Sequence, residues 1–250
     1  MIERIFRVLS PIALLLLWEL IVDIHLLDAR FFPPPSAIAG DFWRFASSGE
    51  LWSNTMVTLV RVIVGFAIGA IPGTALGLLI GVNRWAGAVL DPVIALLYPI
   101  PKIAILPLVL LIFGIGENSK YALVAIGVFF LMTINTAAGV RQIEPIYFDV
   151  ARSLRVRRLS FYLQVLLPGA LVNVFAGIKL SIGIAIVLAI AAEFSAAKSG
   201  LGFTIWNAWQ TLAVERMYVA LVMVSLLGYV LTLVADRLES ALLPWRAERS

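Results

Sequence analysis

Residues 171–192 read LVNVFAGIKLSIGIAIVLAIAA, and only Lys179 among them is charged. A helix of about 20 mainly apolar residues is long enough to cross the hydrocarbon core of a bilayer, which is about 30 Å thick. The stretch therefore predicts a transmembrane helix. Outward from it, similar stretches occur at 9–27, 54–82, 86–113, 121–140 and 217–236. The sequence predicts an all-α integral membrane protein with six spans.

The composition of the whole chain agrees with this fold class. Of 250 residues, 62% are hydrophobic and 14% are charged, whereas a soluble domain has about 45–50% apolar and about 25% charged residues. These values exclude a disordered chain and a protein whose main partner is a nucleic acid. The chain has no cysteine, which excludes a disulfide scaffold and a Cys-based metal site. The lipid bilayer is the first partner that the sequence predicts.

Basic residues are distributed unequally between the two sides of the six predicted spans. One side has eleven of them: Arg4, Arg7, Arg84, Arg141, Arg152, Arg155, Arg157, Arg158, Arg237, Arg246 and Arg249. The other has five: Arg30, Arg44, Lys120, Lys198 and Arg216. Cytoplasmic loops carry the excess of Lys and Arg, so both termini and the loop 141–170 are predicted to face the cytoplasm.

The first and third spans differ from the others. The first carries Glu19 and Asp23 in its second half, and no A-x-A-like site follows it, so we interpret it as a retained helix rather than a signal peptide. In the third span, Pro99, Pro101 and Lys102 interrupt helical hydrogen bonding at membrane depth. Such backbone is tolerated where it is buried in protein or lines a cavity. This element is therefore either a gate in a pathway or a kinked structural helix.

The second span has a glycine at every fourth position. The series comprises Gly65, Gly69, Gly73, Gly77 and Gly81. Overlapping G-x-x-x-G units let a neighbouring helix backbone approach closely, so we interpret the series as a helix-packing face. A sliding surface or a contact between subunits is the alternative.

Charged residues within the spans are candidates for function, because a charge in the bilayer is costly. Arg61 lies about two turns into its span, where its long side chain can reach the interface. Lys102 follows a break that leaves backbone carbonyls for it to bond. Glu193 ends the fifth span. We assign Pro99, Pro101, Lys102 and Glu193 to the pathway as candidate residues. The sequence has no intramembrane chain of carboxylates and histidines of the kind that a proton-coupled carrier uses.

Enzyme and nucleotide signatures are absent from the sequence. Gly-Lys does not occur, which excludes the G-x-x-x-x-G-K-[ST] phosphate loop, and one histidine cannot make H-E-x-x-H. G-x-S-x-G is absent too. We therefore predict no catalytic residue, no metal site and no cofactor.

The most specific stretch lies in the loop 141–170. Pro145 is suited to the first position of a helix, and Ser160 is a plausible N-cap of a second short helix that runs into Pro168. The apolar side chains Val150, Leu154, Val156 and Leu159 form a face that suits a groove on a partner protein. A basic loop lying on anionic lipid is the alternative.

This loop resembles the EAA motif of binding-protein-dependent ABC transporter permeases. Asp149, Val150 and Ala151 occupy the Glu-Ala-Ala positions, and Val165, Leu166, Leu167 and Pro168 close the motif. The order of further motifs, from Leu59-Val-Arg-Val-Ile-Val-Gly65 to Gly200-Leu-Gly202, is similar to the nitrate/sulfonate/taurine branch over roughly residues 30–245. Asp149 replaces the usual Glu. Arg155 replaces the motif glycine, at a turn where glycine permits a positive φ.

The resemblance implies a six-helix type I importer bundle in a bacterial-type plasma membrane, with 1–53 as an N-terminal helix and outer segment. Residues 54–240 would be the permease domain and 241–250 a cytoplasmic tail. The implied partners are two cytoplasmic ATPase subunits, an extracytoplasmic solute-binding protein and a second copy of the permease. The residues implied in coupling to the ATPase are Asp149, Val150, Ala151, Arg152, Leu154, Arg155, Val156, Leu159 and Pro168.

The implied function is ATP-driven import of a small, polar, anionic solute such as nitrate, a sulfonate or taurine. A pyrimidine-type vitamin precursor is the alternative substrate. From the residues alone, a stand-alone ion-coupled carrier or channel remains open, as does an intramembrane enzyme, although no reactive cluster supports the enzyme.

Overall fold

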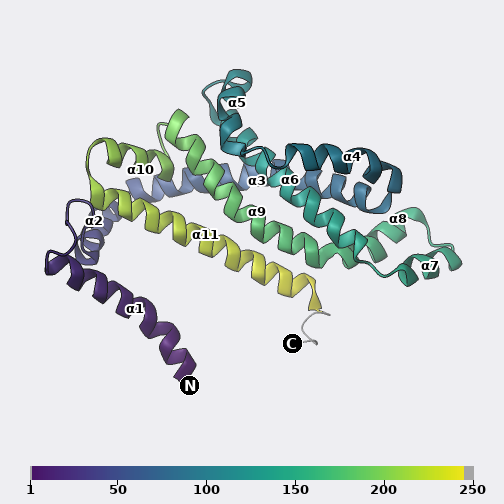
Figure 1. Cartoon of the computed structure of the whole chain (residues 1–250), viewed down its shortest axis with the longest axis horizontal. Helices are drawn as coiled ribbons and strands as arrows, with labels where there is room; N and C mark the ends of the chain where they lie inside the picture. Colours follow the sequence, from purple (N-terminus) through teal and green to yellow (C-terminus); the bar gives the residue numbers. More distant parts are fainter. Residues whose placement is uncertain (1, 245–250) are drawn as a thin grey trace. The chain divides into compact units, whose positions relative to one another are not determined.

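A computed structural model describes the backbone of residues 2–244 and the side chains of residues 9–157 and 159–244. The side chains of Arg4, Arg7, Arg158, Arg246 and Arg249 and the predicted tail from residue 245 lie outside the described residues. Every regular element in the described part of the chain is helical (Figure 1). The elements are α1 (Ile2–Asp23), α2 (Pro35–Ser47), α3 (Glu50–Val82), α4 (Arg84–Leu97), η1 (Lys102–Ile105), α5 (Leu106–Phe113), α6 (Glu117–Arg141), α7 (Pro145–Ser153), α8 (Arg158–Phe161), η2 (Tyr162–Leu166), α9 (Leu167–Ala196), α10 (Leu201–Gln210) and α11 (Val214–Leu242).

Within the described residues, four helices are long and apolar enough to cross a membrane, and a bent helix pair raises the number to five. The four are α3, α6, α9 with the residues that lead into it, and α11. The predicted first span corresponds to α1, whose side chains before residue 9 lie outside the described part of the chain, and it is not among these helices. Its crossing of the membrane stays a prediction.

The predicted third span is broken, as the prolines indicate. It forms α4 and the η1–α5 segment, which are bent by 86° relative to each other (Figure 1). Pro101 has no amide hydrogen to donate to a helix, and the residue before a proline is disfavoured in the α conformation. The chain therefore leaves the helix at Leu97 and resumes a tight turn at Lys102.

The chain divides into two compact units. The first consists of residues 1–58 and 198–225, and the second of residues 59–197 and 226–250. The first contains α2 and α10, two short helices in segments for which the sequence predicted no helix. Pro35 begins α2 at a position where no amide hydrogen is required. Two side chains of α3 cap the start of α10: Gly200 N, just before the helix, donates to Asn54 Oδ1 over 2.7 Å, and Leu201 N, its first amide, donates to Thr58 Oγ1 over 2.8 Å.

Ion pairs also hold this first unit together. Asp41 is buried and pairs with Arg44 and Arg216, and the Arg216 guanidinium lies 4.5 Å from the centre of the Phe45 ring. In the loop between α1 and α2, the Arg30 guanidinium hydrogen-bonds Asp28 and lowers the pKa of that carboxyl to about 2.

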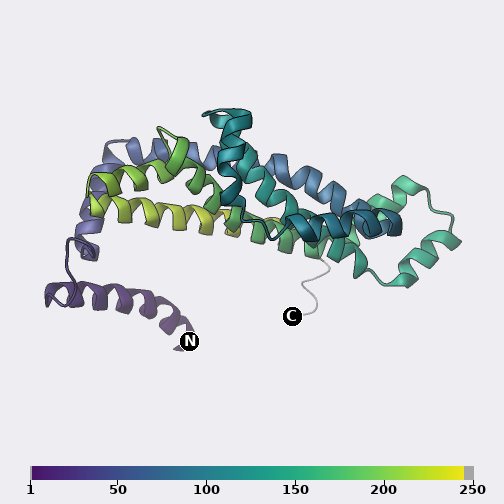
Figure 2. The ribbon, with the colours of Figure 1, turned by 45° about the horizontal axis from the view of Figure 1, so that its top comes forward.

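The core of the second unit is built on α6 and α9, which lie side by side in Figures 1 and 2. The glycine stripe of α3 lies against α6. A Cβ at Gly73 would lie 2.7 Å from the carbonyl oxygen of Phe129, and one at Gly77 would lie 2.6 Å from that of Thr133. Real Cβ atoms do not come so close to a carbonyl. Only glycine therefore permits this approach of the two backbones.

Candidate functional site

The loop between α6 and α9 forms a helical hairpin. Helix α7 begins at Pro145, and α8 begins at Arg158 (Figures 1 and 2). The expected N-cap at Ser160 is wrong, because Ser160 lies inside α8. Nor does the second helix end at Pro168. A π-helical turn over Tyr162–Leu166 leads into α9, and Pro168 lies in the first turn of α9. A π turn is wider than an α turn and often marks a functional site.

Arg155 forms the turn after α7 with a left-handed backbone, at φ +48°. Its amide donates to the carbonyl of Arg152 and that of Val156 to the carbonyl of Ala151, both over 3.0 Å. These two bonds make a Schellman motif, whose left-handed position is usually glycine. The turn is therefore built as a glycine turn although an arginine stands there.

The predicted apolar face of the hairpin is mostly uncovered. Leu154 and Leu159 are 72% and 71% exposed, and Val150 is 48% exposed. Ile146 and Tyr147 are exposed as well. Val156 differs, because it is half-buried and faces the interior of the hairpin. Large apolar side chains exposed together on one element indicate an interaction surface.

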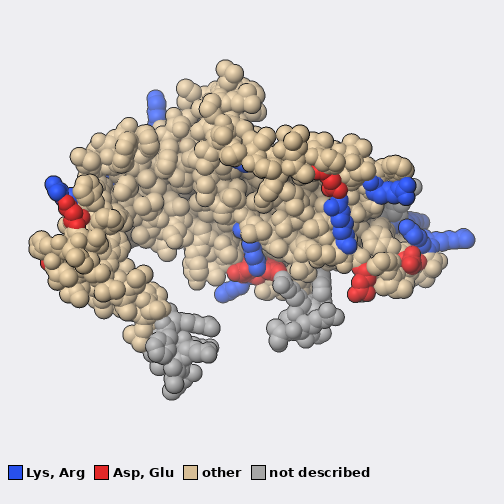
Figure 3. All heavy atoms as spheres, viewed as in Figure 1, with Lys and Arg blue, Asp and Glu red and all other residues tan. Residues whose placement is uncertain are grey.

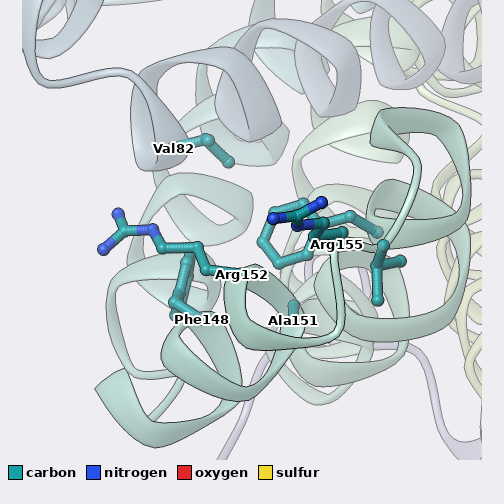
Figure 4. Close-up of a pocket in the computed structure, with 7 residues that line it drawn as sticks. Val82, Phe148, Ala151, Arg152 and Arg155 are labelled. Atoms are coloured by element: carbon teal, nitrogen blue, oxygen red, sulfur yellow. The ribbon is translucent and has the colours of Figure 1, made fainter.

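A hollow of about 700 Å³ lies on the inner side of the hairpin (Figure 4). Phe148 and Phe161 form one wall, with ring centres 5.5 Å apart in an edge-to-face arrangement. Ala151, Arg152, Arg155 and Val156 complete the hairpin side, and Val82 from the end of α3 lies opposite them. The aromatic pair holds α7 to α8, so the hairpin is a packed element.

The charges of the hairpin are exposed. Asp149 pairs with Arg152 one turn later over 3.5 Å, and both side chains are largely in solvent. Such a pair contributes little to stability. Figure 3 shows basic side chains gathered over the part of the surface that carries α7 and α8. Pro168 lies elsewhere, in a second hollow of about 420 Å³ shared with Gln142 and Tyr147 at the start of the hairpin.

Lys102 lies at the break of the third span. Its ammonium donates to the carbonyls of Leu97, Tyr98 and Ile100 over 2.9–3.0 Å and lies 4.4 Å from the centre of the Phe130 ring. The carbonyls that the break leaves open are thus bound by Lys102, as its position in the sequence indicates. Because all three ammonium protons are used, Lys102 holds the elbow together.

Glu193 is fully buried and belongs to a network of four charges. Arg61 Nη1 donates to Glu193 Oε1 over 2.8 Å, while Arg61 Nε and Nη2 each donate to Glu117 over 2.7 Å. Lys120 Nζ lies 3.2 Å from Glu117 Oε1. The network joins α3, α6 and α9 and is neutral in sum. The expectation that Arg61 reaches the interface is wrong, since its side chain is 3% exposed.

Glu117 and Lys120 are the residues of this network that the sequence reading missed. They stand at the start of α6, where a reading of hydropathy takes them for the polar end of a span. The ion pairs join residues that are far apart in the sequence: Glu117 and Arg61 are separated by 56 positions, and Arg61 and Glu193 by 132. The available signal was the presence of an arginine inside an apolar helix, which requires an acidic partner.

Comparison with known proteins identifies the fold and the family of this chain. The helical structure is similar to a chain of the MetNI methionine ABC transporter solved in inward-facing conformations, with a TM-score of 0.59 and 21% sequence identity over 78% of this chain and 95% of that one. The fold is that of a type I ABC importer permease. The chain belongs to the family of binding-protein-dependent transport system inner membrane components, which matches residues 73–245.

Similar curated proteins place the chain in the nitrate/sulfonate/taurine branch of that family. It is 35% identical to the putative aliphatic sulfonates transport permease SsuC of Escherichia coli K12, over 94% of this chain and 89% of the relative. It is 34% identical to the nitrate import permease NrtB of Leptolyngbya laminosa, over 91% and 76%. It is 36% identical to the bicarbonate transport permease CmpB of Synechococcus elongatus, over 79% and 69%. The chain is therefore an ABC importer permease, a multi-pass membrane transport subunit.

Proposed function

We propose that this chain forms the alternating-access pathway of an ATP-driven importer and that ATP is hydrolysed on two separate cytoplasmic ATPase subunits. The observation that carries the proposal is the hairpin of α7 and α8, which presents Val150, Leu154 and Leu159 uncovered. Covering a large apolar side chain yields about 1.5–3 kcal/mol. Three such side chains on one packed element are suited to a groove on the ATPase.

The route from the hairpin to the bundle is short. Helix α6 ends at Arg141, four residues before α7 begins. Arg141 also donates to Asp91 Oδ2 of α4 over 2.6 Å. Movement of the hairpin would therefore reach α6 directly and reach α4 through this ion pair. Helix α4 leads to Pro99, Pro101 and Lys102 at the break, and we propose this elbow as the gate of the pathway.

The proposed solute is a small oxyanion. Aliphatic sulfonates, nitrate and bicarbonate appear in the names of the relatives, and all of them are oxyanions. Taurine, named for an Escherichia coli permease that is 29% identical to this chain, also carries a sulfonate. A pyrimidine-type vitamin precursor is the alternative substrate. Competition of each solute against labelled sulfonate uptake distinguishes the two classes.

We further propose that the importer contains two copies of this chain and an extracytoplasmic solute-binding protein. The termini and the loop 141–170 would face the cytoplasm, which the excess of arginine in that loop supports. This orientation places the hairpin on the side where the ATPase and ATP are found.

The test uses the complex of the chain with its ATPase and binding protein in proteoliposomes. Asp149→Ala combined with Leu154→Asp removes the motif carboxylate and places a charge in the apolar face. Loss of about 2 kcal/mol of contact would weaken ATPase docking by at least about tenfold. We expect substrate-stimulated ATP hydrolysis to disappear while the chain still inserts.

The matched control is Leu212→Asp, a change at another leucine that is 80% exposed but lies outside the hairpin. This variant should retain substrate-stimulated ATP hydrolysis by the complex. Normal coupled hydrolysis in the double variant would contradict the assignment of the hairpin. Uptake driven by an ion gradient through the chain alone would favour a stand-alone carrier.

A further inference from the structure

The two carboxylates that bind Arg61, those of Glu117 and Glu193, differ in their exposure to solvent. Glu193 is fully buried, whereas the side chain of Glu117 is 48% exposed. Glu117 binds Arg61 through both carboxylate oxygens, each over 2.7 Å. Two parallel N–H···O bonds are the geometry with which a guanidinium binds a planar oxyanion. Glu117 is thus the exposed carboxylate of the network, and Arg61 binds it in the way that a guanidinium binds a free oxyanion.

The charges left behind without Glu117 suit one monoanion. Arg61 and Lys120 carry two positive charges, and Glu193 carries one negative charge. The remainder is one positive charge whose groups are 2% and 3% exposed. Lys120 also donates to the Gly116 carbonyl over 3.0 Å, but a carbonyl carries no full charge, and a buried charge that loses its counter-ion is disfavoured. Any departure of Glu117 therefore creates a demand for another anion at the same place.

The surroundings of Glu117 permit that departure. Residue 117 is the first of α6 and follows Gly114, Ile115 and Gly116. A Cβ at Gly114 or Gly116 would have no atom within 4 Å, and Ile115 is 82% exposed. The segment is open on its outer side, so the side chain of Glu117 can rotate outward without displacing a neighbour. Arg61 would stay in place, because Glu193 holds it from the buried side over 2.8 Å.

We propose that Arg61 and Lys120 form an oxyanion-binding site in which the Glu117 carboxylate stands in for the transported anion. The inference rests on the proposed function, because it names the residues that would receive the oxyanion solute. Glu117 keeps the two cations neutral between transport cycles, and an entering sulfonate, nitrate or bicarbonate displaces it. The site takes one negative charge at a time and discriminates against cations and neutral solutes.

The test restores the missing carboxylate with a free anion. Glu117→Ala in the full chain, held in lipid nanodiscs, should lower the melting temperature by about 5 °C, because a charge-assisted pair worth about 2 kcal/mol is lost. Millimolar nitrate or methanesulfonate should recover most of this loss. Dimethyl sulfone, the neutral isostere of methanesulfonate, and chloride at equal ionic strength should recover none of it. Lys120→Met in the same background should weaken the recovery by about tenfold, since one charged donor is removed.

Glu50→Ala is the matched control. Glu50 also lies in the first turn of a long helix, and within the described residues it forms no ion pair. Its melting temperature should not respond to nitrate. An equal response of the two alanine variants, or no response of Glu117→Ala to either oxyanion, would overturn the proposal.

A second variant keeps the proposal testable if Glu117→Ala does not fold. Glu117→Gln keeps the size of the side chain and removes its charge. It should bind nitrate about tenfold more tightly than the natural chain does, because the competitor is now neutral. Equal affinity would overturn the site. These binding results are separate from the proposed function: ATP-driven uptake without anion recovery would refute this site alone, and anion recovery without ATP-driven uptake would refute the importer mechanism alone.

Discussion

Arg155 has a backbone conformation that an L-residue with a side chain adopts at a cost. The left-handed region costs a non-glycine residue about 1–2 kcal/mol, and Arg155 lies there at φ +48°. The cost is offset locally, because the turn satisfies the carbonyls of Ala151 and Arg152 at the end of α7. The side chain of Arg155 also lines the hollow beneath the hairpin. Strain at such a position is often retained for function.

This strain gives a prediction at the scale of a single residue. Arg155→Gly and Arg155→Ala both remove the guanidinium, but only glycine relieves the backbone. The amide of Val156, bonded to Ala151, should therefore exchange its hydrogen about fivefold more slowly in the glycine variant than in the alanine variant, for a difference of about 1 kcal/mol. Hydrogen–deuterium exchange measures this. Equal rates in the two variants would mean that the turn carries no strain.

Single residues also show how far the sequence alone leads. The bonds of Lys102 follow from local order, because the carbonyls that it binds lie within five residues of it. The partners of Arg61 do not, because they come from two other helices whose rotation about their axes is set by packing. An arginine within an apolar helix indicates that an acidic residue pairs with it, but the sequence does not show which acidic residue that is. Contacts within one short segment, such as those of Lys102, could therefore be predicted from the sequence. Contacts between helices, such as those of Arg61, could not.

At the scale of the element, the contact between α3 and α6 depends on small residues. Gly77→Ala should destabilise the folded chain by about 1–3 kcal/mol, the usual cost of overpacking, because the added methyl would lie 2.6 Å from both the Thr133 carbonyl oxygen and Thr136 Cβ. Gly183→Ala is the control, since that glycine lies within α9 with no atom within 4 Å of a Cβ. It should be neutral or gain about 0.5–1 kcal/mol.

Thermal unfolding in detergent measures both glycine variants. Similar losses in the two would show that the stripe is no close contact and that glycine matters there for another reason. A loss confined to Gly77→Ala would support tight packing of α3 on α6.

The elements themselves were predictable to different degrees. Long apolar runs predict long helices, and the prolines at 99 and 101 predict the break. The two short helices α2 and α10 were missed because they are too short and too polar for a search of spans. The π turn over Tyr162–Leu166 was not predicted either; it precedes Pro168, which has no amide hydrogen to donate to the preceding turn. Contacts formed across a fold leave little trace in local periodicity.

At the scale of the whole molecule, two groups of charged residues differ in their surroundings, one paired within the spans and one exposed on the hairpin. The described spans contain few charged residues, and the network of Arg61 neutralises its own within the bundle. The exposed charges of α7 and α8 remain available outside the spans. This division fits a permease that binds a solute within the bundle and a motor protein at the hairpin.

We propose that the hairpin of α7 and α8 is the surface to which a cytoplasmic ATPase binds. The chain has no cysteine, so a single introduced cysteine is a unique label. Leu154→Cys, treated with a short bifunctional reagent that reacts with the thiol at one end and with lysine amines at the other, in membranes that contain the co-expressed ATPase, should give a covalent adduct of the chain with the ATPase. Leu212→Cys, at a leucine that is 80% exposed against 72% for Leu154 but lies outside the hairpin, should give none. No adduct from Leu154→Cys, or equal adducts from both positions, would show that the hairpin is not the ATPase-binding surface.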